Sequence, residues 1–313
     1  MVLRVKRERI GRSLLGSAAL ALLLLSAQAA AAASYSVPST EEERQALARA
    51  AEAGEPDALY IVGALGIQGQ IMGLTRDEGL AALMQSADAG NADANYLLGI
   101  IYSTGQGQRR DPAKAAEHLQ MAAGAGHPDA QAALGQAYLS GNGVAQDGAQ
   151  AARWLEQAAA QGSDTARINL GILLLSGDPG LRDPTRGVEL LRTAADQGVA
   201  AAQYNLGQVY AEGIGVTAQP AAAQPWYRVA AEKGYQRAQL ALGRLLLKQD
   251  NPDFDPVEGT AWIILAAAGS NERVREAGSA VLAQLAEQLP QQLLNEAREQ
   301  ARITMMRLGM SGQ

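Results

Sequence analysis

Hydrophobic positions between residues 128 and 162 follow a helical spacing in two runs, separated by a polar loop. In the first run Ala130, Leu134 and Tyr138 lie four residues apart, which places them on one face of a helix. The second run has an apolar stripe made of Ala151, Trp154, Leu155, Ala158 and Ala159. Gly141 and Gly162 follow the two runs, and glycine often ends helices because it adopts the left-handed conformation. The pattern predicts a helix-turn-helix unit.

This unit recurs six times at a step of 36 residues without insertion. A Leu-Gly pair, replaced by Val-Gly in the first copy, lies inside each predicted first helix. Its glycines are Gly63, Gly99, Gly135, Gly171, Gly207 and Gly243. Self-similarity at such a period indicates stacked helical repeats. We therefore expect an all-α fold, a right-handed α-α solenoid of six 36-residue helix-turn-helix repeats with helical caps.

The glycine inside each first helix has a cost in helix propensity of about 1 kcal/mol relative to alanine. Six such positions imply a packing reason, and we expect two helix backbones to cross there too closely for a Cβ atom. The second helices begin with Asp-Pro at Asp111, Asp183 and Asp255, and with Asp147 alone in the third repeat. Aspartate at the N-cap and proline at the first helical position are typical of helix starts.

Residues 130–162 resemble the Sel-one-like repeat, a subclass of the tetratricopeptide-like repeats. The matching positions are Ala130, Leu134, Gly135, Tyr138, Gly141, Gly143, Val144, Asp147, Ala151, Trp154, Ala158, Ala159 and Gly162. The resemblance extends over about residues 54–270 and implies the fold and a binding role rather than a particular function.

Several loops depart from the repeat pattern. Ile71 and Pro179 replace the second loop glycine of the first and fourth repeats, and Gln219 replaces the N-cap aspartate of the fifth. The sixth repeat has Gln249-Asp250-Asn251-Pro252 in place of its loop glycines. We expect partner specificity to lie in the irregular fourth and sixth loops.

The predicted organisation has four parts. Residues 1–33 form a signal peptide, 34–53 a linker and N-terminal capping helix, 54–270 the solenoid, and 271–313 a C-terminal helical cap. Thr40 and Glu43 have the spacing of a capping box. Two helices are expected in the C-terminal cap, over 271–288 and 290–308.

The first 33 residues have a basic start, an apolar run from Leu14 to Leu25 and small residues up to Ala33, which is typical of a secretory signal peptide. An uncleaved membrane anchor is the alternative. We expect an exported chain, periplasmic if the source is a Gram-negative bacterium, with no integral membrane span after cleavage. Residues 1–33 carry five basic residues and one acidic residue, so cleavage changes the net charge from −6 to −10. Such an acidic chain is a poor partner for nucleic acid.

The sequence contains few residues that could bind a metal or catalyse a reaction. It has no cysteine, and its two histidines, His118 and His127, are not spaced as metal ligands. His118 occupies the column of Trp154 and is expected to be a packed ring, whereas His127 is expected to be exposed at a helix start. No metal, cofactor or catalytic residue is predicted. Cysteine-rich relatives are described as penicillin-binding or weakly β-lactam-hydrolysing, but their disulfide framework has no counterpart here.

By analogy with tetratricopeptide repeats, the first helices line a concave binding wall. Positions three before and one after the interior glycine are expected to point inward. The predicted partner-binding residues are Tyr96, Ile100, Gln136, Tyr204, Gln208 and Arg244. The alternative for Tyr96 and Tyr204 is packing against neighbouring repeats.

We therefore expect an exported, non-catalytic scaffold or adaptor for protein-protein interaction in the bacterial cell envelope, as the exported relatives in polysaccharide export and secretion imply. Its partners would be proteins, with envelope polysaccharide or secretion machinery as candidates. One alternative is a periplasmic regulator that binds and represses a membrane sensor protein. A β-lactamase-like or penicillin-binding member is the remaining alternative.

Overall fold

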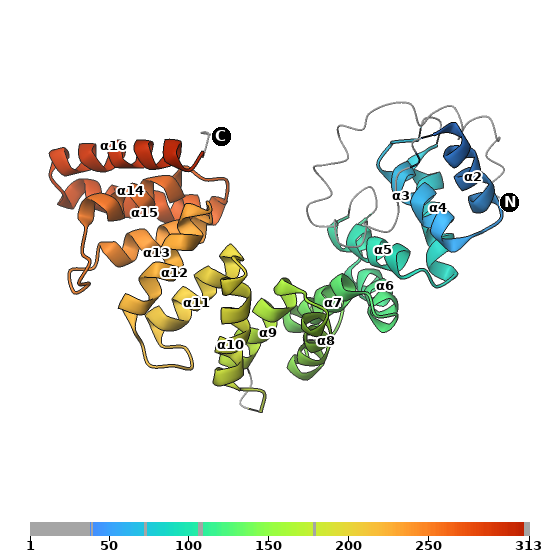
Figure 1. Ribbon diagram of the computed structural model, residues 1–313, viewed down its shortest axis with the longest axis horizontal. Coiled ribbons are helices and arrows are strands. Elements are labelled where there is room, and N and C mark those ends of the chain that lie inside the picture. The colour runs from blue at the N-terminus through green and yellow to red at the C-terminus, as the bar shows by residue number, and fades with distance from the viewer. Residues whose placement is uncertain (1–37, 39, 72–73, 106–108, 178–179, 310–313) are drawn as a thin grey trace. The chain divides into compact units, whose positions relative to one another are not determined.

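The computed structural model describes residues 38, 40–71, 74–105, 109–177 and 180–309. In these residues the only regular secondary structure is helical, and the chain divides into two compact units, of which unit 1 ends at Ser163 and unit 2 begins at Asp164. Figure 1 runs from unit 1 in blue and green to unit 2 in yellow and red. The helices of unit 1 are α2 (Glu41–Glu52), α3 (Pro56–Ile67), α4 (Arg76–Asp88), α5 (Ala92–Thr104), α6 (Pro112–Gly124), α7 (Pro128–Ser140) and α8 (Gly148–Ala160). Those of unit 2 are α9 (Asp164–Ser176), α10 (Pro184–Asp196), α11 (Ala200–Glu212), α12 (Pro220–Glu232), α13 (Gln236–Leu246), α14 (Pro256–Ala267), α15 (Glu272–Gln288) and α16 (Gln291–Arg307).

The six predicted helix pairs are present as α3–α4, α5–α6, α7–α8, α9–α10, α11–α12 and α13–α14, and within each unit consecutive pairs pack on one another. The all-α repeat fold expected from the sequence is therefore confirmed. Each pair buries the residue that precedes its interior glycine, which is Val62 in the first pair and leucine in the others, and Leu98, Leu134, Leu206 and Leu242 have no exposed surface.

The predicted helix starts are confirmed by side-chain caps. Thr40 and Glu43 form both hydrogen bonds of a capping box at the start of α2. The four aspartates that precede second helices each accept a hydrogen bond from the third residue of the helix; these are Asp111, Asp147, Asp183 and Asp255. Gln219 makes no such bond, so α12 begins on Pro220 without a side-chain cap.

The interior glycines lie where the two helices of a pair cross. A Cβ atom at Gly243 would lie 2.7 Å from the carbonyl oxygen of Gly259 on α14, and one at Gly63 would lie 2.9 Å from that of Gly79 on α4. At Gly135 the nearest atom is instead Cγ of Leu155, at 2.6 Å. A backbone atom of the second helix therefore lies within 3.0 Å of the added Cβ only where that helix also carries a glycine. Elsewhere a buried side chain fills the space that the missing Cβ leaves.

A column of buried amides joins successive repeats. Each amide nitrogen donates to a carbonyl near the end of the preceding second helix. The bonds are Asn95 Nδ2 to Ala87 at 3.1 Å, Gln131 Nε2 to Ala123 at 3.2 Å, Gln203 Nε2 to Ala195 at 3.0 Å and Gln239 Nε2 to Ala231 at 3.2 Å. Arg167 occupies this column in the fourth repeat and binds Asp164 and Gln197. Each of these carbonyls also accepts the backbone amide of the glycine three residues later, so the side-chain amide adds a second hydrogen bond at the helix end.

The expectation that His127 is exposed is wrong, because its exposed fraction is only 7%. Its Nδ1 accepts a hydrogen bond from the Ala130 amide and caps α7, and its Nε2 lies 3.2 Å from Oδ1 of Asp93. The ring stacks on Tyr96 with 4.5 Å between centroids. A histidine side chain can replace aspartate or asparagine as a cap acceptor, which the sequence pattern did not indicate. His118 is a packed ring as expected, parallel to Tyr102.

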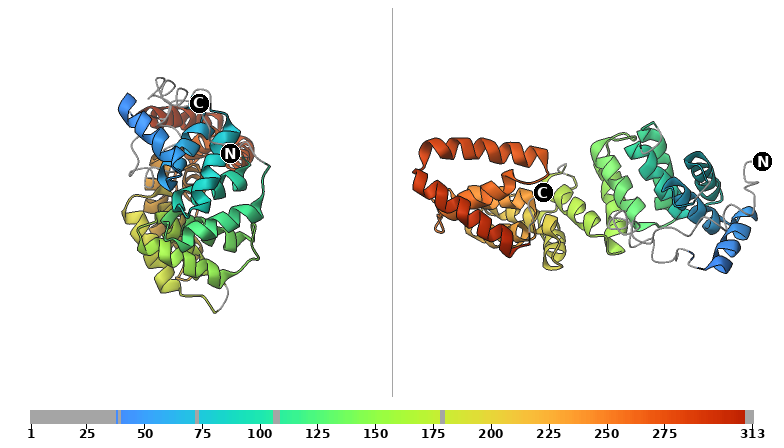
Figure 2. Two further views of the ribbon diagram at one scale, coloured as in Figure 1. Left: turned by 90° about the vertical axis from the view of Figure 1, so that its right-hand side faces the viewer. Right: turned by 90° about the horizontal axis from the view of Figure 1, so that it is seen from above.

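The C-terminal end of unit 2 is formed by the two helices expected after residue 270. Both α15 and α16 pack on α14 (Figure 1 and Figure 2). Near this end Arg228 of α12 forms a two-armed ion pair with Glu258 of α14, and Trp262 Nε1 donates to the same carboxylate at 3.1 Å. The hydrogen bond from Arg228 lowers the pKa of Glu258. This pair therefore joins the fifth repeat to the sixth.

Two sequence predictions lie outside the described residues. They are the signal peptide at 1–33 and the irregular fourth loop around Pro179. Among the helices that the structure describes, none has the length and apolar character needed to cross a membrane.

The crossing geometry predicts opposite effects for two helical glycines. Gly243→Ala would place a methyl group against the Gly259 carbonyl, which cannot move without shifting α14, so we expect a loss of about 1–3 kcal/mol in the free energy of unfolding. Gly124→Ala, at the end of α6 with no atom within 4 Å, should instead gain up to about 1 kcal/mol. Urea unfolding followed by circular dichroism would measure both. Equal midpoints for the two variants would contradict the proposed packing role.

The Arg228–Glu258 pair predicts a pH-dependent contribution to stability. Because the folded pKa of Glu258 is lowered, the contribution is present above the ordinary value of 4.5 and is lost as the pH falls through the folded pKa. Glu258→Gln should destabilise the chain at neutral pH by roughly 1 kcal/mol, allowing for partial exposure of both side chains. The difference from the unmodified chain should shrink in acid. Glu299→Gln, in the exposed pair with Arg302, is the matched control and should not shift the unfolding midpoint.

Candidate functional site

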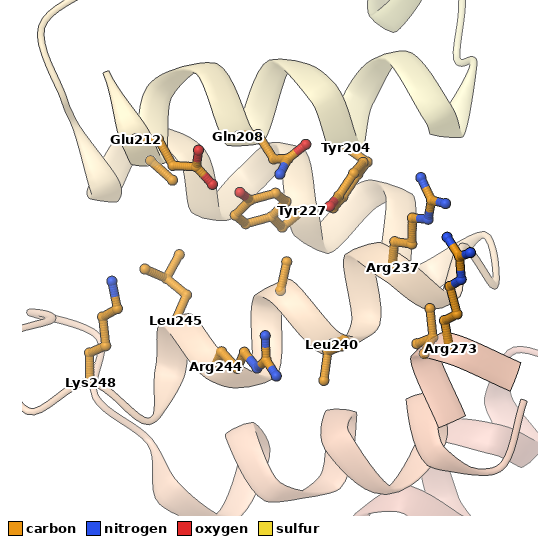
Figure 3. A pocket seen from close by; sticks show the side chains of 13 residues that line it. Tyr204, Gln208, Glu212, Tyr227, Arg237, Leu240, Arg244, Leu245, Lys248 and Arg273 are labelled. Carbon is orange, nitrogen blue, oxygen red and sulfur yellow. The ribbon is translucent and has the colours of Figure 1, made fainter. Parts of the chain in front are cut away.

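The candidate site is a groove of about 470 Å³ in unit 2, between the first helices of the fifth and sixth repeats and the start of α15. Helix α11 contributes Tyr204, Gln208, Ala211 and Glu212, and Tyr227 reaches it from α12. Helix α13 and the residues after it contribute Arg237, Leu240, Ala241, Arg244, Leu245 and Lys248, and α15 adds Arg273 and Val274. Figure 3 shows the side chains of α11 facing those of α13 across the groove.

The rim of the groove is basic. Arg237, Arg244, Lys248 and Arg273 are exposed, and Glu212 is the single acidic residue that lines it. Lys248 lies at one end of the groove, whereas Arg237 and Arg273 lie side by side at the other (Figure 3). This local positive charge contrasts with the net charge of −6 of the whole chain.

Two tyrosines form the inner part of the groove. The rings of Tyr204 and Tyr227 lie 5.9 Å apart, and Tyr204 also contacts Tyr235 at 5.4 Å. Burial raises the pKa of both Tyr204 and Tyr227, so their hydroxyl groups stay protonated at neutral pH and can donate hydrogen bonds.

Tyr227 lies here because of the glycine opposite it. Residue 227 belongs to a column that holds leucine at 83, 119, 155 and 191. A Cβ atom on Gly207 would lie 2.6 Å from the Tyr227 ring, so the glycine leaves room for an aromatic side chain at this crossing. The ring extends past Gly207 toward the groove.

Of the six residues predicted to bind a partner, Tyr204, Gln208 and Arg244 line this groove together. Tyr96, Ile100 and Gln136 belong to unit 1 and do not line it. Tyr96 packs against the neighbouring repeat through His127, and burial, with the charge of Asp129, raises its pKa. Ile100 is half-buried and Gln136 is exposed.

The remaining basic residues and Tyr227 were missed by the sequence prediction. Tyr227 could have been found as the one aromatic residue in a leucine column. Arg237 could also have been found, because its column holds Asp57, Asp93 and Asp129 in the first three repeats. Arg273 had no such signal, since α15 lies outside the repeat period.

Within the described ranges, no group of three or more His, Asp or Glu side chains could hold a metal ion. His118 is the histidine with a lowered pKa, and the cause is burial. It contacts Asn95 Oδ1 through Nδ1 at 3.0 Å, in the packed interior of unit 1.

Comparison with known proteins identifies relatives of the chain. The Sel1 repeat model matches four consecutive segments, residues 92–127, 128–163, 165–199 and 200–235. These segments are the second to fifth repeats of the sequence period. No curated protein matches the chain in sequence.

Two solved structures are similar over most of this chain. One is a protective antigen present in uropathogenic Escherichia coli strains that displays an SLR fold, with 28% identity and a TM-score of 0.73. The similarity covers 85% of this chain and 56% of the antigen, so the chain spans little more than half of that protein. The other is a Sel1 repeat protein from Oxalobacter formigenes, with 26% identity, a TM-score of 0.61, and coverage of 70% of this chain and 87% of that one.

The four matched segments coincide with four of the observed helix pairs, and the two solved structures have a similar fold. Sel1 repeat proteins form a scaffold family that generally mediates protein-protein interaction. The chain therefore contains four Sel1 repeats, between residues 92 and 235.

Proposed function

We propose that the chain is an exported, non-catalytic adaptor of the bacterial cell envelope, which binds a protein partner on the first-helix face of its repeats. The observation that carries this proposal is the groove between α11 and α13. It presents tyrosine, glutamine and arginine side chains on two adjacent repeats that pack against one another. Tyrosine and arginine are enriched where proteins bind one another, because they combine a large contact area with hydrogen bonding.

Export is supported by the sequence of residues 1–33, with its basic start and apolar run. A chain without cysteine has no disulfides, so in the envelope its stability would depend on packing and on the hydrogen bonds described above. The glycine crossings and the amide column are contacts of this kind.

The proposal predicts that photocrosslinking from the groove captures a partner. A photoreactive phenylalanine analogue at Gln208 should give a discrete adduct with an envelope protein in the organism that encodes the chain. The same analogue at Met121, an exposed position on α6, is the matched control and should give none. An adduct with an assembly or secretion component would support the adaptor. An adduct with a membrane signalling protein would instead identify a repressor that uses the same face, and absence of any Gln208-specific adduct would contradict the proposal.

A second prediction concerns catalysis. The purified chain should not turn over a chromogenic β-lactam, because its groove presents no serine or cysteine nucleophile among its lining residues. Hydrolysis followed by absorbance would test this. Robust turnover that a single substitution abolishes would overturn the non-catalytic assignment.

A further inference from the structure

We propose that the groove of unit 2 binds an extended, acidic segment of the partner, in which Asp or Glu residues alternate with apolar ones. This inference rests on the proposed adaptor function and specifies the chemistry of the segment that is bound. Four features of the groove support it.

The first feature is that the basic side chains of the rim are available to bind an anionic partner. Within the described part of the chain, no carboxylate lies within ion-pair distance of Arg237, Arg244, Lys248 or Arg273. Other arginines of the chain do have such partners, as Arg228 has in Glu258. Cations that are not neutralised within the chain attract an anionic partner and orient it as it approaches.

The second feature is their spacing. Arg237 and Arg244 lie seven residues apart on α13, about 10 Å along the helix axis, and Lys248 lies two residues beyond the end of the helix, at the end of the groove opposite Arg237. An extended peptide covers the distance from Arg237 to Arg244 with about three residues. A compact anion such as phosphate could contact one end of this row only, so the arrangement fits a linear polyanion.

The third feature is that the charge belongs to the last repeat. The column of Arg237 holds aspartate in the first three repeats. The column of Lys248 holds Gln68 in the first repeat, serine or threonine in the second to fourth, and Glu212 in the fifth. The basic row is therefore not a property of the repeat itself. It is added where α15 contributes Arg273 beside Arg237 (Figure 3).

The fourth feature is the apolar inner part of the groove. Leu240 and Val274 belong to one buried cluster, and Leu245 lies beside the Tyr227 ring in a second. These side chains offer apolar contact below the basic rim, while the hydroxyl groups of the tyrosines and the amide of Gln208 can bond to peptide groups. An apolar floor with polar groups on either side suits a peptide whose apolar and acidic side chains alternate. It suits a polysaccharide less well, because the rings of a polysaccharide are covered with hydroxyl groups.

Fluorescence anisotropy with the purified full chain tests the proposal. The probe is a labelled hexapeptide with blocked ends that alternates Glu and Leu, and the matched probe carries Gln in place of Glu. We expect the Glu peptide to bind at least about fivefold more tightly, with affinity that falls as salt is added. Equal affinity of the two peptides would overturn the inference, as would tighter binding of a short oligogalacturonate.

Substitutions on the basic rim test whether the Glu peptide binds in the groove. Arg244→Gln with Lys248→Gln should weaken the Glu peptide by about five- to tenfold. The control is Arg298→Gln with Arg302→Gln on α16, which makes the same change in charge at exposed positions and should leave the affinity unchanged. Glu212→Gln removes the one opposing carboxylate and should tighten binding about two- to threefold. The inference fails if the rim and control variants behave alike.

The acidic-segment inference and the adaptor function can fail separately. If no acidic peptide binds but the analogue at Gln208 still captures an envelope protein, the adaptor stands and the acidic segment is wrong. If the Gln208 adduct is also absent, both are wrong.

Discussion

The close crossing of two helices at an interior glycine is the constraint on which the rest of this structure depends. Each repeat buries its apolar face only if its two helices approach closely, and a Cβ atom on the first helix would prevent that approach. Where the second helix also has a glycine, as at Gly79, Gly187 and Gly259, the backbone itself fills the gap. Where it does not, a leucine or tyrosine fills it.

The join between repeats depends on different contacts. Buried amides at the start of four of the first helices bond to carbonyls at the end of the preceding second helix, so a polar group that would otherwise be costly to bury sets the register of one repeat on the next. The same step of 36 residues carries this column. Histidine at position 127 adds a third kind of join, because it caps its own helix and stacks on Tyr96 of the repeat before.

The groove arises from departures from this repeated plan. Tyrosine replaces leucine at position 227, arginine replaces aspartate at 237, and lysine replaces a small hydroxyl residue at 248. The interior glycine of each repeat and the leucine before it stay in place, so the fold is kept while the face that it presents is altered. A repeat scaffold can therefore acquire a local binding chemistry without a new fold, because the rim residues lie outside the columns that form the core.

The sequence by itself determined the architecture. A step of 36 residues without insertion, with a leucine and a glycine inside each first helix and an aspartate before most second helices, predicted every helix pair and most of their caps. It also selected Tyr204, Gln208 and Arg244, because positions on either side of the interior glycine share one face of a helix. These features are local or recur at a fixed period, so they can be recognised in the sequence without knowing how the repeats pack.

The tertiary structure alone decided which of those side chains meet. It buried His127 against Asp93 and Tyr96, and it separated the residues of unit 1 from those that line the groove. It also brought Arg273 beside Arg237, through the contact of Val274 with Leu240. The position of α15 depends on how the last helix pair packs, and the repeat period carries no information about a helix that lies beyond it.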